Sequence, residues 1–141
     1  TKNYLKPKFI CLIYPTAPLL LPVDLVNSFN MIKKKKYKCI FSAVKNSYPI
    51  QRSFYLNRKK EISMMYKKFF YKRSQDLQQT FHDAGQFAWG SYDAWVKNKI
   101  NFSKTSKFYL LPPYRVQDID NYDDLETAKR LYKGMISGYK K

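Results

Sequence analysis

The stretch from Tyr71 to Gly90, Y-K-R-S-Q-D-L-Q-Q-T-F-H-D-A-G-Q-F-A-W-G, sets directed polar groups among aromatic residues. It holds two of the chain's four glycines and six polar or charged residues with strong donors or acceptors: Arg73, Gln75, Asp76, His82, Asp83 and Gln86. A packed core does not need such a set. A pocket for a polar, anionic ligand with several hydroxyl groups does, because a few placed donors and acceptors among apolar walls fix such a ligand. The stretch therefore predicts a ligand site.

A second informative stretch is acidic, in a chain whose net charge is +17. Five of the ten acidic residues lie in the nine positions from Asp118 to Glu126. Three of them fall in the first turn of a predicted helix, where acids offset the helix dipole; these are Asp123, Asp124 and Glu126. Asp118 and Asp120 precede that turn, and in extended backbone residues two apart point to the same side. Neighbouring carboxylates repel unless a cation lies between them, and Mg²⁺ prefers such oxygens. The pair predicts a magnesium site, with capping or solvated acids as the alternative.

The positive charge alone does not predict a nucleic-acid-binding protein. The chain has 22 lysines and only five arginines, whereas phosphate and base-edge recognition favours arginine. Most lysines are scattered, and an AT-rich coding sequence enriches lysine regardless of function. No apolar run is long enough to span a bilayer, and no charged-then-apolar leader is visible. Cys11 and Cys39 lie in strand-like apolar runs and are expected to be buried, reduced thiols.

The N-terminal part reads as strand, helix, strand. Residues 9–14, F-I-C-L-I-Y, form a continuous apolar run, which suits a strand covered on both faces as in a parallel sheet. The prolines that follow predict a shaped loop at the carboxyl end of that strand, where open α/β sheets bind ligands. Residues 24–35 predict an amphipathic helix and residues 39–44 a second buried strand. Together they predict a right-handed crossover unit.

The remaining elements are shorter, and the chain is expected to form one domain. Residues 52–56 alternate weakly, with a turn at Asn57-Arg58, while residues 62–71 have no clear pattern. Strands are predicted over 86–89 and 108–111, and Ser91 is expected to cap a helix running to about Asn98. A final helix is predicted from about Asn121 to Met135, with four apolar residues on one face: Leu125, Ala128, Tyr132 and Met135.

Five motifs occur in an order that resembles a known enzyme family. They are Y-P-T-A-P-L-L (14–20), S-A-V (42–44), R-S-Q-D-L (73–77), H-D-A-G-Q-F (82–87) and Q-D-I-D (117–120). Over about residues 9–135 the chain resembles the acylneuraminate cytidylyltransferases, most of all the branch that activates pseudaminic acid. The resemblance implies an α/β, Rossmann-like nucleotidyltransferase fold with a mostly parallel or mixed sheet flanked by helices. It also implies cytoplasmic, Mg²⁺-dependent transfer of CMP from CTP to a nonulosonic acid, with pyrophosphate release, for surface-glycan biosynthesis. Members of the family commonly form homodimers, and no membrane partner is expected.

The resemblance also assigns expected roles to individual residues. Asp118 and Asp120 resemble the metal ligands, and Arg73 resembles the arginine that holds the sugar carboxylate, for which its planar fork is suited. These three are the candidate catalytic residues. Candidate substrate-binding residues are Tyr14, Thr16, Arg73, Gln75, Asp83, Gln86 and Phe87. Structural roles remain open for several of them: Thr16 as a loop cap, Phe87 in the core, and the two glutamines as packing groups. His82 reads as a structural residue or a general base, and Arg115 as a neutralising or phosphate-binding group.

Three departures from the family pattern carry further expectations. Residues 14–18 read Y-P-T-A-P where sialic acid enzymes read Q-P-T-S-P, and Asp83-Ala84 stands where they carry Asn-Gly; both favour the pseudaminic branch. The family's basic R-x-G-S-K-R nucleotide loop has no counterpart before Phe9. Residues 1–141 are therefore expected to be a partial cytidylyltransferase domain, incomplete at the N-terminus, with a basic tail at 134–141. The alternatives are a truncated, inactive relative and a basic nucleic-acid-binding module.

Overall fold

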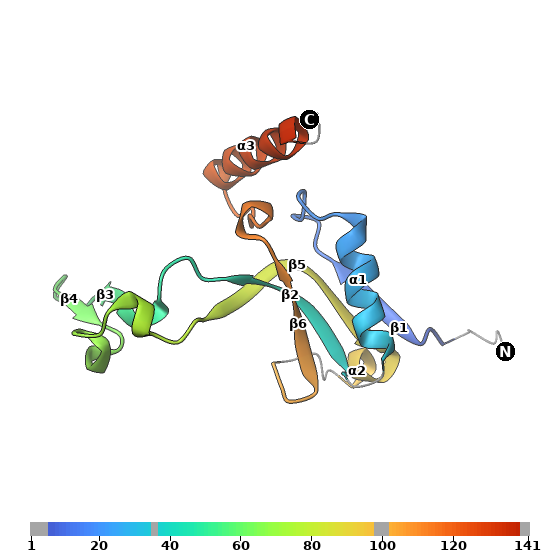
Figure 1. The fold of residues 1–141 in the computed structure, drawn as a ribbon, viewed down its shortest axis with the longest axis horizontal. Coiled ribbons are helices and arrows are strands. Elements are labelled where there is room, and N and C mark those ends of the chain that lie inside the picture. The colour runs from blue at the N-terminus through green and yellow to red at the C-terminus, as the bar shows by residue number, and fades with distance from the viewer. Residues whose placement is uncertain (1–5, 35–36, 98–101, 139–141) are drawn as a thin grey trace. The chain divides into compact units, whose positions relative to one another are not determined.

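The computed structural model describes residues 6–34, 37–97 and 102–138. The chain divides into two compact units. The first, here called the main unit, comprises Thr1–Val44 and Asp83–Lys141; the second, the hairpin unit, comprises Lys45–His82. Figure 1 shows the helices and strands of each. The single domain predicted over residues 1–141 stays a prediction.

The main unit is built on a four-stranded mixed sheet in the order β1-β5-β2-β6. β1 (Phe9–Ile13) pairs antiparallel with β5 (Phe81–Ser91), and β2 (Cys39–Lys45) pairs parallel with β6 (Ser106–Leu111). Figure 1 labels these strands and the helices that flank them. The predicted α/β class with a mixed sheet is confirmed, and the arrangement is consistent with a Rossmann-like nucleotidyltransferase.

The two apolar N-terminal runs both form strands, but their surroundings differ. β2 is buried along Cys39–Val44 apart from the half-buried Phe41, as predicted. β1 was expected to be covered on both faces, and that expectation is wrong: Leu12 and Ile13 are 43% and 48% exposed. The reason is its place in the sheet. β1 stands at one end of the described strand order, and β5 lies between it and β2. An apolar run indicates a strand but not how many neighbours it has.

Helix α1 (Pro22–Lys33) begins two residues before the predicted Asp24, because proline is tolerated in the first turn of a helix. Its predicted last residue, Lys35, lies outside the described residues. Asp24, Ser28 and Ile32 are buried, so the helix turns one face inward. On that side the indole Nε1 of Trp89 in β5 donates a hydrogen bond to Ser28 Oγ at 3.1 Å.

Two further helices follow the predicted positions. Helix α2 (Tyr92–Val96) is capped as predicted, with Ser91 Oγ accepting a hydrogen bond from Ala94 N at 3.2 Å. The predicted end of this helix, Asn98, lies outside the described residues. Helix α3 (Tyr122–Gly138) buries Ala128, but Tyr132 is 48% exposed and does not share the buried face. Residues 134–138 of the predicted basic tail are helical, and 139–141 are not described.

The hairpin unit contains two short antiparallel strands, β3 (Phe54–Leu56) and β4 (Ile62–Met64). Asn57 turns the chain between them, as predicted: its Oδ1 accepts hydrogen bonds from the amides of Lys59 at 2.9 Å and Glu61 at 3.0 Å. Three 3₁₀ turns complete the unit: η1 (Ile50–Arg52), η2 (Lys67–Phe69) and η3 (Ser74–Asp76). Gln51 is its one buried residue, so this unit has no apolar core of its own.

The cysteines and the helices give no sign of disulfide bonding or membrane insertion within the described part of the chain. Cys39 is buried, Cys11 is half-buried, and both are free thiols. Burial raises the pKa of each thiol to about 11, so both stay protonated near neutral pH. None of the described helices has the length and apolar character needed to cross a bilayer.

Candidate functional site

The loop after β1 is bonded to β5 at its start and is closed by a turn within the loop near its end. Tyr14 N donates to Gln86 O of β5 at 3.0 Å, and Leu20 N donates to Ala17 O at 3.3 Å. Leu19, near the end of the loop, has a buried side chain that anchors the loop in the core. Thr16 lies between these anchors and is half-buried. The proline-rich loop predicted from the sequence is therefore a held segment that carries Thr16 at the carboxyl end of β1.

β5 carries an irregularity at Gly85, whose φ of +59° is in the left-handed region. Gly85 N donates to Asp83 Oδ1 at 3.0 Å. The next two amides, of Gln86 and Phe87, both donate to the buried Ser42 Oγ of β2, at 3.1 and 3.2 Å. A Cβ at position 85 would lie 3.7 Å from Asp118 Oδ2. The bend in β5 therefore places a residue without a side chain beside Asp118.

The side chain of Asp118 lies beside both the loop after β1 and the bend at Gly85 in β5. It follows the 3₁₀ turn η4 (Pro113–Arg115) that comes after β6. Its Oδ1 accepts hydrogen bonds from Thr16 Oγ1 at 3.4 Å and from Ile119 N at 3.0 Å, while its Oδ2 faces Gly85. Thr16, Gly85 and Asp118 come from three of the five sequence motifs. We refer to these three residues as the Asp118 cluster.

Asp120 lies where the chain enters α3. The amides of Asp120 and Asn121 both donate to Asp124 Oδ2 at 3.2 Å, and Asp124 N donates to Asn121 Oδ1 at 3.1 Å. This reciprocal pattern caps the helix. The predicted structural role of Asp124 is confirmed, whereas the exposed carboxylate of Asp120 takes no part in the cap.

The chemistry of Asp118 and Asp120 fits a magnesium ion. Both are exposed, and neither forms an ion pair with a described lysine or arginine. No three His, Cys, Asp or Glu side chains in the described ranges group closely enough to enclose a metal by themselves. Two carboxylates are nevertheless a normal protein contribution to Mg²⁺, which keeps several waters and takes phosphate oxygens from a substrate. Mg²⁺ at this pair stays a prediction.

An ion pair that the sequence did not predict lies near the cluster. Asp24, in the first turn of α1, is 1% exposed. Its carboxylate accepts hydrogen bonds from both terminal nitrogens of Arg115, with Nη2 to Oδ1 at 3.0 Å, and also from Leu21 N at 3.1 Å and Tyr109 Oη at 3.3 Å. Arg115 therefore neutralises Asp24 and not, as considered from the sequence, the pair Asp118 and Asp120.

The environment of Asp24 keeps its carboxyl ionised. Burial alone would raise its pKa, but the hydrogen bonds from Arg115 and Leu21 and the charge of Arg115 outweigh that effect. The net result is a pKa below the usual 3.8. The pKa of Arg115 is raised by the same contact. The pair is thus held in its charged form at neutral pH.

Two predicted substrate-binding residues lie in the core. Gln86 is fully buried; its Nε2 donates to Ala84 O at 3.3 Å, and its buried Oε1 has no hydrogen-bond partner among the described residues. Phe87 is buried against Tyr109, with 6.1 Å between the ring centroids. Tyr14 and Asp83 are exposed. The core alternative for Phe87 fits its position, and a substrate role for each of the four stays a prediction.

Arg73 and Gln75 belong to the hairpin unit, which is described apart from the Asp118 cluster. Both are exposed. The guanidinium of Arg73 holds Asp76 in a two-point contact, with Nε to Oδ2 at 2.7 Å and Nη2 to Oδ1 at 3.1 Å. This is the fork geometry with which arginine binds carboxylates. The predicted role of Arg73 in holding a sugar carboxylate stays a prediction.

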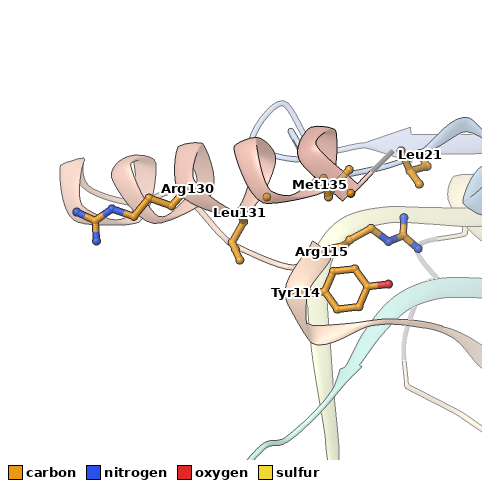
Figure 2. Close-up of a pocket in the computed structure, with 8 residues that line it drawn as sticks. Leu21, Tyr114, Arg115, Arg130, Leu131 and Met135 are labelled. Atoms are coloured by element: carbon orange, nitrogen blue, oxygen red, sulfur yellow. The ribbon is translucent and has the colours of Figure 1, made fainter. Parts of the chain in front are cut away.

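A pocket of about 490 Å³ lies beside α3 in the main unit. It is lined by Leu21, Tyr114, Arg115, Arg130, Leu131, Gly134, Met135 and Gly138, of which the sequence pointed only to Arg115, as a neutralising or phosphate-binding group. In Figure 2 the side chain of Arg115 extends toward the segment that carries Leu21, whereas Arg130 extends away from it. The pocket therefore borders Arg115 of the ion pair and is not lined by Asp118.

Sequence comparison identifies relatives of the chain. No protein-family profile matches it. It is 41% identical, over 124 residues, to proteins named pseudaminic acid cytidylyltransferase from two serotypes of Campylobacter jejuni subsp. jejuni, O:2 and O:23/36. This chain shares a family relationship with the cytidylyltransferases. The match covers 88% of the chain and 53% of each relative, so the chain spans about half the length of these curated cytidylyltransferases.

A second type of cytidylyltransferase relative combines two named activities. It is the Helicobacter pylori protein named pseudaminic acid cytidylyltransferase and UDP-2,4-diacetamido-2,4,6-trideoxy-beta-L-altropyranose hydrolase. The identity is 31% over 113 residues, which is 79% of this chain and 22% of that protein. The family resemblance predicted from five short motifs is thus confirmed over most of the chain.

Proposed function

We propose that this chain is part of a cytidylyltransferase that transfers CMP from CTP to pseudaminic acid or a similar nonulosonic acid. The observation that carries the proposal is the Asp118 cluster, in which three of the five motifs, far apart in sequence, meet at one carboxylate. The 41% identity to proteins named for this reaction supports the same activity. Phosphoryl transfer depends mainly on positioning and charge stabilisation, so a fixed carboxylate between two held segments is the type of site it needs.

In this proposal Asp118 and Asp120 hold Mg²⁺, which supplies positive charge beside the phosphates of CTP. Thr16 orients Asp118 through its hydroxyl, and Gly85 leaves room beside the carboxylate because it has no side chain. The anomeric hydroxyl oxygen of the sugar acid bonds to the α-phosphorus, the bond from that phosphorus to the bridging oxygen breaks, and pyrophosphate leaves. The hydroxyl proton passes to solvent.

The sugar acid is proposed to bind through Arg73. The two-point contact with Asp76 supports this role, because the same fork accepts a free carboxylate. We assign Tyr14, Gln75 and Asp83, which are exposed, to contacts with the sugar acid, together with the buried Gln86 and Phe87. We place the reaction in the cytoplasm, in surface-glycan biosynthesis, with the protein acting as a homodimer.

The test is CTP-dependent pyrophosphate release with Mg²⁺, offering pseudaminic acid and N-acetylneuraminic acid in parallel. Because the chain spans about half of its relatives, two proteins are compared. One is the chain itself; the other is the Campylobacter relative with its matched segment replaced by this chain. We expect the chimera to release pyrophosphate with pseudaminic acid only. Activity of the chimera but not of the chain alone would mean that the residues of this chain support the reaction only together with the rest of the enzyme.

Point variants of the chimera test the assigned residues. Asp118→Asn and Asp120→Asn should each lower kcat by about a hundredfold or more, because each removes charge from the phosphate-binding region. The matched control is Asp123→Asn, an exposed acid in the first turn of α3 that should leave kcat unchanged. A folded chimera that is silent with both sugar acids while the parent enzyme is active would refute the proposal.

A further inference from the structure

The two segments that meet at Thr16 and Asp118 are joined a second time. Asp24 follows Thr16 by eight residues, and Arg115 precedes Asp118 by three residues. The Asp24–Arg115 ion pair therefore connects the same two parts of the chain that the Thr16–Asp118 hydrogen bond connects. Two attachment points fix both the separation and the direction of one segment relative to the other.

The two attachment points differ in strength. The Thr16–Asp118 hydrogen bond is 3.4 Å long and exposed to solvent, so it cannot hold the segments by itself. The ion pair is two-pronged, and the side chains of Arg115 and Asp24 are only 12% and 2% exposed. Two neutral donors, Leu21 N and Tyr109 Oη, complete the contacts of the carboxylate. A shielded, fully hydrogen-bonded pair holds a fixed geometry where an exposed pair does not.

The contacts of Asp24 join three segments: the loop that carries Thr16, β6 and η4. Leu21 N belongs to the end of the loop that carries Thr16, Tyr109 belongs to β6, and Arg115 belongs to η4, from which the chain continues to Asp118. Displacing this carboxylate would release the loop and the Asp118 segment together. Nothing in the proposed reaction assigns a task to either Asp24 or Arg115.

We infer that Asp24 and Arg115 are positioning residues for the proposed magnesium site: their ion pair holds the Thr16 loop against the segment that carries Asp118 and Asp120. The inference rests on the proposed function for the identity of the cation. It concerns the geometry of two protein segments, so it can be tested without catalysis. The fork of arginine is required, because lysine keeps the charge but offers no two-point contact.

The first test compares Arg115→Lys with Arg130→Lys in the full chain. Arg130 is an exposed arginine of α3, so the control makes the same chemical change away from the ion pair. Binding of Mn²⁺, as a probe for Mg²⁺, is followed by water proton relaxation. We expect Arg115→Lys to raise the Kd for Mn²⁺ by about tenfold, as for residues that orient metal ligands, and Arg130→Lys to leave it unchanged. Equal Kd values in wild type and Arg115→Lys would overturn the inference.

A second readout separates this inference from the proposed function. The amide of Ile119 donates to Asp118 Oδ1 at 3.0 Å, so its hydrogen-exchange rate reports how firmly the Asp118 segment is held. Exchange at Ile119 should be faster in Arg115→Lys than in Arg130→Lys. If the wild-type chain binds no Mn²⁺, the proposed magnesium site fails, while faster exchange at Ile119 still supports the positioning role. Unchanged exchange would refute that role.

Two further variants guard against loss of folding. Tyr109→Phe removes the hydrogen bond to Asp24 Oδ1 and the weak one from Asn27 Nδ2, and it leaves the ion pair in place. It should therefore shift Mn²⁺ binding and Ile119 exchange in the same direction by a smaller factor. The exchanged pair Asp24→Arg with Arg115→Asp should restore part of the Mn²⁺ affinity that Arg115→Asp alone loses. Absence of any rescue, in a double variant that folds, would count against the ion pair as the positioning device.

Discussion

Position 85 requires glycine because of its backbone conformation more than because of the space around it. A Cβ at this position would lie at ordinary contact distance from Asp118, 3.7 Å from Oδ2, so no steric clash excludes alanine. The φ of +59° is the real constraint, because residues with a side chain rarely adopt it. Gly134 in α3 offers the opposite case, since a Cβ at that position would have no neighbour within 4 Å and its helical backbone suits alanine.

Replacing these two glycines by alanine should change the free energy of unfolding in opposite directions. Gly85→Ala should lower the free energy of unfolding by about 1–2 kcal/mol, the cost of a left-handed backbone with a side chain. Gly134→Ala should raise it by about 0.5–1 kcal/mol, because alanine is the better helix former. Urea unfolding of the two variants and wild type measures both. A stability gain in Gly85→Ala would show that position 85 does not keep its positive φ in solution.

Site residues could be predicted from the sequence where they belong to a local motif. They could not be predicted where their role depends on a contact with a residue far away in the sequence. Asp118 stood out because two acids are separated by one residue ahead of a helix. Asp24 and Arg115 did not, since their contact joins positions 91 residues apart and neither sits in an unusual local pattern. An acid in the first helical turn is explained by the helix dipole alone, so nothing in the local pattern points to its partner.

At the scale of elements, two neighbouring acids at the start of α3 differ in role although they look alike in sequence. Asp123 and Asp124 both lie in the first turn. Only Asp124 accepts hydrogen bonds from the amides ahead of the helix, those of Asp120 and Asn121. The cap therefore also fixes the backbone of Asp120, one of the two proposed metal ligands, while the dipole effect is common to both acids.

The matched pair Asp124→Ala and Asp123→Ala separates capping from the dipole. Both variants lose one negative charge in the same turn and gain the same helix propensity. We expect Asp124→Ala to be less stable than Asp123→Ala by about 1 kcal/mol, the usual contribution of a capping side chain. Thermal or urea unfolding measures the difference. Equal stabilities would mean that the capping contacts at Asp124 contribute nothing to α3.

Strand identity was easier to predict than strand pairing. Apolar runs correctly indicated β1 and β2, and the capped helix at Ser91 followed from local chemistry. The insertion of β5 between β1 and β2 could not be predicted, because pairing depends on residues far away in the sequence. β5 itself runs over Phe81–Ser91, well beyond the predicted 86–89, since the polar residues at its start carry no strand pattern.

At the scale of the whole molecule, the hairpin unit leaves many apolar side chains in solvent. Phe54, Leu56, Ile62 and Met65 are all exposed, and Gln51 is the only buried residue of the unit. Exposed apolar surface of this kind marks an association site more often than a free surface. We expect the proposed homodimer to associate through this surface.

The association prediction uses one facing pair of the hairpin. Leu56 and Ile62 lie opposite each other in the β3–β4 register and are both exposed, so replacing them removes little packing within the chain. Wild type should sediment as a dimer, and the double variant Leu56→Ser with Ile62→Ser as a monomer. Lys59→Ser, an exposed change in the same hairpin, should remain a dimer. A monomeric wild type at all concentrations would contradict the prediction.

The residues that contact each other in the site are far apart in the sequence, which affects how the protein folds during synthesis. The Thr16–Asp118 contact spans 102 positions and the Asp24–Arg115 pair spans 91, so Thr16 and Asp24 are synthesised long before their partners. Until Arg115 leaves the ribosome, the Asp24 carboxylate has no partner charge, and α1 cannot settle into its final place without burying it unpaired. Helix α1 is therefore expected to dock only after Arg115 has been synthesised, and a nascent chain stalled before Arg115 should remain open to proteases.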